Sequence, residues 1–315
     1  MERLSNIRQL TADRLAAATY PPRRLALVHT GISLAGSLIL MILTYLLSRQ
    51  VADTGGLAGI GTRAALQSAQ SVLSIALTVA TPFWEFGFLA VAMGLGRGQS
   101  VGLRDLTRGF QRFGPVLRLI LLQAILYLLI ALAASQVAGT AVLMTPLGTD
   151  LMALMQSLAE NADFVTTGVV PEEMMLPIIK AAAPMYVVTG ILFIAAFIPV
   201  SYRLRLARYM LMDEDKPRAL MCLLASNRAM KGNCLAFFKL DLRFWWYWLL
   251  QGLCAVIAFG DLWLPLVGVQ LPFGADAAVF VFGGLQMAGL LLLAYYWRSQ
   301  VETAYAIAYD ELTDA

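Results

Sequence analysis

Long apolar runs constrain this chain more than any other feature of its sequence. Several of them exceed the roughly 18 residues that a helix needs to cross a bilayer. Only 14% of the 315 residues are charged, against about a quarter in soluble domains. The sequence therefore predicts an all-α polytopic membrane protein in which residues 1–315 form a single membrane domain. Six transmembrane helices are expected, at about residues 25–47, 70–95, 115–138, 178–202, 242–264 and 277–297.

The segments between the predicted spans differ in character. Residues 1–24 carry five arginines and two acids, and they predict an amphipathic helix. They are not typical of a signal peptide, because the apolar run that follows is too long. Residues 139–177 contain five acids and no Lys or Arg, and apolar residues at helical spacing predict an interfacial helix there. Residues 203–241 form a basic connection, and residues 298–315 an amphipathic tail.

The basic residues predict how the spans are oriented. Lys and Arg are held on the cytoplasmic side during insertion. Of the 23 Lys and Arg residues, 20 lie in residues 1–24, 94–118 and 203–243 and in the tail. The other three fall on the opposite side, together with the acidic segment. We therefore expect both termini and the basic connection in the cytoplasm, and residues 139–177 outside.

Residues 209–248, in the longest cytoplasmic connection, predict a helix, a tight turn and the entry of a span. The helix is expected to start at Pro217, since proline suits a first helical turn, and to stop at Gly232 and Asn233. An aromatic stretch with basic residues follows, as at a membrane interface. The candidate surface for anionic lipid headgroups or a protein partner consists of Arg218, Arg228, Lys231, Lys239 and Arg243.

Each odd-numbered span follows a cytoplasmic helix and a Gly, Pro or Asn turn, near residues 10–22, 103–115 and 219–233. This pattern predicts a threefold helix-span-span pseudo-repeat, of the kind found in transporter folds. The same pattern arises if every in-out hairpin simply needs a basic turn. Both explanations stay open at the level of the sequence.

Two stretches carry a family resemblance. The run PRALMCLLASNRAMKGNCLAFFKLDLRFWWYWLL over residues 217–250, and the AYDEL ending over residues 308–312, resemble a bacterial integral-membrane family of the domain-of-unknown-function 975 type. The resemblance extends over about residues 81–313. The chain is also distantly similar to the membrane domain of glycerophosphodiester phosphodiesterases, without their hydrolase domain. The resemblance implies a protein of the bacterial cytoplasmic (inner) membrane and a fold, but no reaction.

Groups that carry chemistry are scarce. The only histidine, His29, lies near the start of the first span, where it is expected to make interfacial hydrogen bonds. Cys222, Cys234 and Cys254 match no metal or redox spacing. We therefore expect no enzyme, no cofactor, no metal site and no nucleic-acid partner.

Charged residues inside or beside the spans are the sharper signal. Glu85 lies among aromatic residues, about a dozen positions before the end of the second span, where an unpaired carboxylate is costly. Its expected partners lie at matching ends of the fourth and sixth spans, and the candidate polar cluster consists of Glu85, Arg203, Arg205, Arg298 and Glu302. This cluster is either a bridge that holds the hairpins together or an ion, proton or anion site.

Two function classes follow from these observations. In the first, the protein is a membrane scaffold or accessory subunit, whose basic helices contact anionic lipid, a protein partner or a second copy of the chain. In the second, it is a small transporter or channel, with Pro82 and Pro199 breaking spans beside Glu85 and Arg203.

Overall fold

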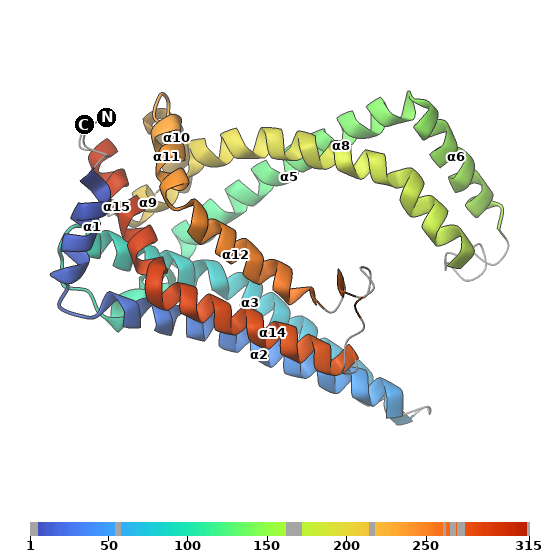
Figure 1. Cartoon of the computed structure of the whole chain (residues 1–315), viewed down its shortest axis with the longest axis horizontal. Coiled ribbons are helices and arrows are strands. Elements are labelled where there is room, and N and C mark those ends of the chain that lie inside the picture. Colours follow the sequence, from blue (N-terminus) through green and yellow to red (C-terminus); the bar gives the residue numbers. More distant parts are fainter. Residues whose placement is uncertain are drawn as a thin grey trace. The chain divides into compact units, whose positions relative to one another are not determined.

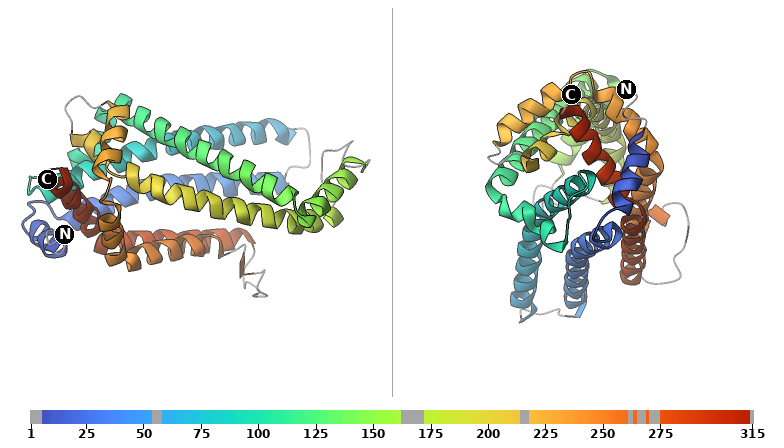
Figure 2. Two further views of the ribbon diagram at one scale, coloured as in Figure 1. Left: turned by 90° about the horizontal axis from the view of Figure 1, so that it is seen from above. Right: turned by 90° about the vertical axis from the view of Figure 1, so that its left-hand side faces the viewer.

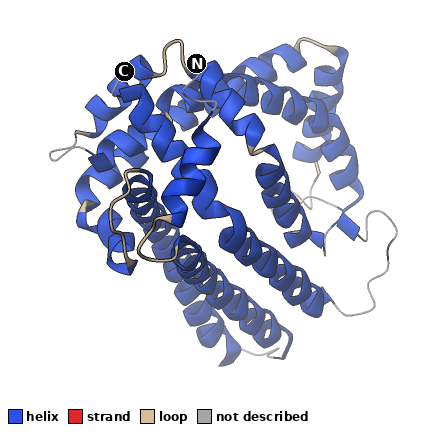
Figure 3. Ribbon diagram, turned by 60° about the vertical axis from the view of Figure 1, so that its left-hand side comes forward, coloured by secondary structure: helices blue, strands red, loops and turns tan. Residues whose placement is uncertain are grey.

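The computed structural model describes residues 6–53, 58–161, 172–213, 218–260, 263–264, 269 and 275–313. Within these residues every regular element is a helix and none is a strand (Figure 3), which confirms the predicted all-α class. Five helices are long and apolar enough to cross a membrane: Pro22–Leu46, Gln67–Gly96, Phe113–Leu143, Met174–Asp213 and Ala277–Thr313. The chain is therefore built as a multi-pass membrane protein.

The chain divides into two compact units. The first unit contains Met1–Arg118 and Leu206–Ala315, and the second contains Leu119–Arg205. The boundary falls inside one long helix, α5 (Phe113–Leu143), and again just after another, α8 (Glu172–Leu204). The first unit thus joins the two ends of the sequence, and it carries most of the polar contacts described below.

Three long apolar helices form the body of the first unit. These are α2 (Pro22–Asp53), α3 (Ala58–Gly96) and α14 (Ala275–Leu293). Helix α2 packs against both α3 and α14, so that the three run side by side (Figure 1). Helix α12 (Trp245–Ala258) packs against α14.

Short helices gather at one end of this body. They are α1 (Ile7–Ala16), η2 (Leu103–Thr107), α4 (Arg108–Gln111), α9 (Ala207–Asp213), α10 (Ala219–Ala229) and α11 (Cys234–Arg243). The stop predicted after α10 is confirmed: Gly232 has a φ of +88°, in the left-handed region that favours glycine. The Asn233 side chain donates a hydrogen bond to the carbonyl of Ala229, at 2.8 Å, and so caps the end of α10. Pro217, the predicted start of that helix, lies outside the described residues.

The predicted tail is part of the core. Helix α14 continues through a π-helical segment, η3 (Ala294–Arg298), into α15 (Ser299–Thr313). Helix α15 packs against α1 and α3, and α1 and α15 lie beside each other in both views of Figure 2. Nine of its residues are buried, most of them small or aromatic. An alanine-rich face lets α15 approach its neighbours closely, and this explains why the helix is buried rather than lying free.

Helix α3 comes unusually close to η2 and α4. A side chain at Gly87 would overlap the backbone carbonyl of Leu106, and one at Gly109 would overlap that of Phe83. The ring of Phe83 stacks on Phe113 at a centroid distance of 4.5 Å. Two glycines therefore allow the backbones to touch, and stacked aromatic rings fill the space beside them.

The second unit consists of the rest of α5, α6 (Pro146–Ala159) and α8. Helix α6 packs against α8, and the rings of Tyr127 in α5 and Phe197 in α8 are 4.8 Å apart.

The prediction that prolines break the spans is wrong. Helix α3 continues through Pro82 and α8 through Pro199, because a proline removes a single hydrogen bond, and the turns on either side retain theirs.

The predicted span at residues 242–264 corresponds to two helices in the structure. Helix α11 ends at Arg243, and α12 starts at Trp245 after a non-helical Phe244. With 14 residues, α12 is about 21 Å long, whereas the hydrocarbon core is about 30 Å thick. Residues 261–262 and 265–268 lie outside the described part, so the fifth predicted span, at residues 242–264, stays a prediction.

Candidate functional site

An ion pair links α3 to the π-helical segment of the first unit. Arg298 Nη2 lies 2.7 Å from Glu85 Oε2, and Arg298 Nη1 donates a hydrogen bond to Thr30 Oγ1 at 3.0 Å. The guanidinium also lies over the ring of Phe88, 5.0 Å from its centroid. Arg298 therefore connects three elements, α2, α3 and η3, in a single set of contacts.

The other predicted members of the polar cluster belong to α15 and to the second unit. Glu302 is in α15, one helical turn beyond Arg298. Arg203 and Arg205 belong to the second unit, where the Arg205 guanidinium lies 5.7 Å from the ring centroid of Tyr202. Within the first unit, the charges of Glu85 and Glu302 both act on the Arg298 guanidinium. A role of Arg203 and Arg205 in the same cluster stays a prediction.

His29 reinforces the same junction between α2 and α3. Its Nε2 lies 3.1 Å from the carbonyl oxygen of Trp84, and Trp84 Nε1 donates to the carbonyl of His29 at 3.0 Å. The two rings are stacked, 5.5 Å apart. Since a carbonyl only accepts, Nε2 must carry the proton; Nδ1 is buried and has no hydrogen-bond partner among the described residues. His29 thus holds two helices together.

These contacts give the junction the chemistry of a bridge. Both charges of the Glu85–Arg298 pair are matched, and the guanidinium has further hydrogen-bonding and ring partners. Among the described residues, no group of three or more His, Cys, Asp or Glu side chains is placed to hold a metal ion.

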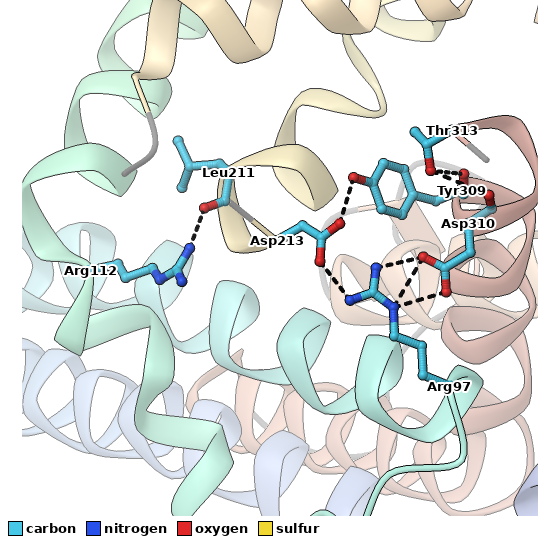
Figure 4. Close-up of polar contacts among 7 residues, drawn as sticks. All are labelled: Arg97, Arg112, Leu211, Asp213, Tyr309, Asp310 and Thr313. Atoms are coloured by element: carbon cyan, nitrogen blue, oxygen red, sulfur yellow. Dashed lines mark hydrogen bonds and ion pairs between the residues drawn. The ribbon is translucent and has the colours of Figure 1, made fainter. Parts of the chain in front are cut away.

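A second polar centre, which the sequence did not predict, surrounds Arg97 at the end of α3. Its guanidinium contacts both carboxylate oxygens of Asp310 in α15, at 2.6–3.2 Å. It also contacts Asp213 Oδ1 in α9 at 2.5 Å. Tyr309 donates to the other oxygen of Asp213 at 3.1 Å, as Figure 4 shows. The hydrogen bonds from Arg97 to Asp310 and Asp213 raise the pKa of the guanidinium above its usual value.

We call the four residues Arg97, Asp213, Tyr309 and Asp310 the Arg97 clamp. Nearby, Arg112 donates to the backbone carbonyl of Leu211 at 2.7 Å, so α9 is held at two points (Figure 4). The partners of Arg97 lie 116 and 213 positions along the chain. The only signal in the sequence was an arginine in a glycine-rich turn and acidic residues at two distant helix ends, and this pattern does not specify a pairing.

The predicted basic surface lies on α10, on α11 and in the turn between them. Arg218, Arg228, Lys231, Lys239 and Arg243 are all exposed. Large apolar side chains on the same two helices are exposed as well: Leu220, Met221, Leu224, Leu235, Phe238 and Leu242. Residues 218–243 therefore present cations and apolar groups together, as helices at a membrane interface do.

A pocket of about 940 Å³ opens between α1, the start of α2, the α11–α12 junction and the η3–α15 junction. Its cationic lining consists of Arg8, Arg23, Arg24 and Arg243, and its aromatic lining of Phe244, Trp246, Tyr295 and Trp297. Among the described residues, no Asp or Glu lines it. Arg243 was predicted as a surface residue, but the other three arginines of the pocket come from a segment more than 200 residues earlier, and no sequence pattern links that segment to Arg243.

Comparison with protein families, with curated proteins and with solved structures gives no match for this chain in any of the three. The family resemblance stated above stays a prediction.

Proposed function

We propose that this protein is a non-enzymatic membrane scaffold or accessory subunit that contacts anionic lipid through basic helices at its cytoplasmic face. The observation that carries the proposal is the joint exposure of cations and large apolar side chains on α10 and α11. In the part of the chain that the structure describes, no carboxylate pairs with Arg218, Arg228, Lys231 or Lys239. Each cation near an anionic membrane surface contributes about 1 kcal/mol of attraction.

The proposed topology follows the same charges. We place both termini and residues 203–243 in the cytoplasm of a bacterial cell and the protein in its cytoplasmic membrane, with α12 as the beginning of the predicted span at residues 242–264. The three helix-span-span segments form the proposed pseudo-repeat. Cysteine accessibility from the two sides of the membrane tests this arrangement. Labelling of residue 150 in α6 and of residue 228 in α10 from the same side would overturn it.

Hydrogen exchange tests the lipid contact directly. We expect residues 218–243 to exchange more slowly in nanodiscs with phosphatidylglycerol than in discs of phosphatidylcholine alone. The difference should vanish at about 0.5 M salt, where screening acts over a few ångströms, and in a variant with glutamine at Arg218, Arg228, Lys231 and Lys239. Helix α6, which carries no Lys or Arg, is the internal control. Equal exchange of residues 218–243 in both discs would overturn the proposal.

A protein partner or a second copy of the chain is the other occupant that we propose for the same surface. In that case the exchange of residues 218–243 would not depend on the headgroup. Crosslinks from Lys231 and Lys239 in native membranes would then reach another chain instead of lipid.

Transport is the second candidate function, with a polar site near Glu85, Arg203 and Arg298. The observation that favours it is the π-helical segment directly before the ion pair, because such segments are frequent at functional sites. Flux through proteoliposomes containing Glu85→Gln separates the two roles. Altered flux with intact assembly supports transport, whereas loss of assembly supports the bridge.

A further inference from the structure

We propose that the pocket between α1, α2, α11–α12 and η3–α15 binds one anionic phospholipid, with its phosphate held by Arg8, Arg24 and Arg243 and its first chain segments against Trp246 and Trp297. This inference rests on the proposed function and makes it more specific, since it assigns the lipid contact to a defined cavity. The exposed helices α10 and α11 would contact many lipids in exchange, whereas the pocket would retain one.

The charge of the pocket selects an anion. In the part of the chain that the structure describes, four arginines and no carboxylate line it. Arg8 and Arg24 are exposed, and neither has an ion-pair partner within the described residues. Arg23 lies over the ring of Tyr295, 5.7 Å from its centroid. Guanidinium groups present a planar fork of donors that matches the oxygens of a phosphate, so arginine is the side chain expected at such a site.

The backbone adds to this preference. Helix α2 begins at Pro22, and Pro21 and Pro22 line the pocket together with Arg23 and Arg24. The first turn of a helix carries partial positive charge, which favours an anion. Here it supplements the side chains and does not define the site alone.

The remaining lining selects an amphiphile over a free anion. Apolar side chains from α1 and α11 line the cavity, among them Ile7, Leu15 and Leu240. The rings of Trp246 and Trp297 meet edge to face at 4.8 Å. A volume of about 940 Å³ is at the upper end of the range for ligand pockets, roughly 300–1,000 Å³, and greatly exceeds that of a phosphate ion. A headgroup with the adjoining part of its chains matches both the polar and the apolar lining.

Native mass spectrometry of the full chain, titrated with phosphatidylglycerol or phosphatidylcholine, tests this inference. We expect the wild type to retain one phosphatidylglycerol per chain and the variant R8Q/R24Q to bind it at least tenfold more weakly. The variant R104Q/R118Q loses the same charge at two exposed arginines that line neither the pocket nor the α10–α11 surface, and it should bind like the wild type. Because Lys keeps the charge but not the planar fork, R8K/R24K should bind phosphatidylglycerol more weakly than the wild type and more tightly than R8Q/R24Q. Size exclusion checks that this variant elutes as the wild type does.

Several results would overturn the inference. These are equal retention of the two lipids by the wild type, equal weakening in R104Q/R118Q, or unchanged binding in R8Q/R24Q. A fourth is displacement of phosphatidylglycerol by inorganic phosphate at the same concentration, which would identify a soluble phosphate as the ligand. If the hydrogen-exchange difference at residues 218–243 persists while pocket binding fails, the proposed function stands and the pocket assignment is wrong.

Discussion

The Glu85–Arg298 pair is the contact whose removal should be felt most strongly. In the variant Glu85→Gln, the amide keeps the size of the side chain but removes the charge that faces Arg298. The Arg298 side chain is only 16% exposed and that of Glu85 44%, so the arginine is the more desolvated partner. After the change it would retain the Thr30 hydroxyl and the ring of Phe88 as neighbours.

The expected cost follows from these exposures. Removing one partner of a fully buried pair costs about 3–5 kcal/mol, and two charges about 4 Å apart at an effective dielectric constant of about 20 attract by about 4 kcal/mol. Because the Glu85 carboxylate is partly exposed, we discount these figures for screening and expect a loss of about 2–3 kcal/mol of unfolding free energy. The double variant E85Q/R298Q removes both charges of the ion pair and should recover part of that loss.

Unfolding by sodium dodecyl sulfate in mixed micelles, followed by tryptophan fluorescence, measures these changes. Glu160→Gln, directly after the end of α6, is the matched control, since it makes the same chemical change at an exposed residue and should cost less than about 0.5 kcal/mol. If Glu85→Gln is no more destabilising than this control, the pair does not act as a bridge. The single variant Arg298→Gln completes the cycle. If the unfolding free energy lost in E85Q/R298Q equals the sum of the losses in the two single variants, the two side chains are not coupled.

Three further changes test the packing of the first unit. Gly87→Ala should destabilise it by at least about 1–3 kcal/mol, because the new methyl group meets backbone atoms of Leu106. Gly114→Ala is the control, since its methyl group meets nothing within 4 Å. Equal unfolding midpoints of the two variants in the detergent titration would contradict the close approach of α3 to η2. Arg97→Gln should lower the free energy of unfolding by about 1–2 kcal/mol and speed hydrogen exchange in α9 and α15. The control Arg104→Gln, at an exposed residue, should change neither. Unchanged exchange in α15 of the Arg97→Gln variant would argue against the Arg97 clamp. Tyr305→Phe removes the hydrogen bond to the Asp241 carboxylate in α11 and should lower the free energy of unfolding by about 1–2 kcal/mol. The same detergent titration measures this loss. A loss within experimental error would show that water replaces this hydrogen bond.

Local signals in the sequence predicted much of the fold. Apolar runs specify helices because a bilayer leaves no other way to satisfy the backbone, and a glycine with an asparagine ended α10 at the expected place. The pairing of Glu85 with Arg298 was predictable because a carboxylate deep in an apolar run needs a partner, and few cations are available at that depth.

The remaining features depend on contacts that no local pattern encodes. The tail has an apolar face, but its periodicity does not say which helices cover it, and α15 proved to be buried against α1 and α3. The interruption at Phe244 was not visible, because the residues on both sides are equally apolar and aromatic. The Arg97 clamp and the pocket both contain residues that lie more than 200 positions apart in the chain. Sequence periodicity does not predict contacts between residues so far apart.

The burial of α15 has a consequence for how the chain is made. Arg298 is synthesised 213 residues after Glu85, a delay of about 10 to 40 s at bacterial and eukaryotic rates of translation. During that interval α2 and α3 are already present, but Glu85 lacks its ion-pair partner and Arg97 is without Asp310. Assembly of the first unit therefore waits for the arrival of α15, and a ribosome that stalls before Arg298 would leave an unpaired carboxylate in an otherwise finished pair of helices.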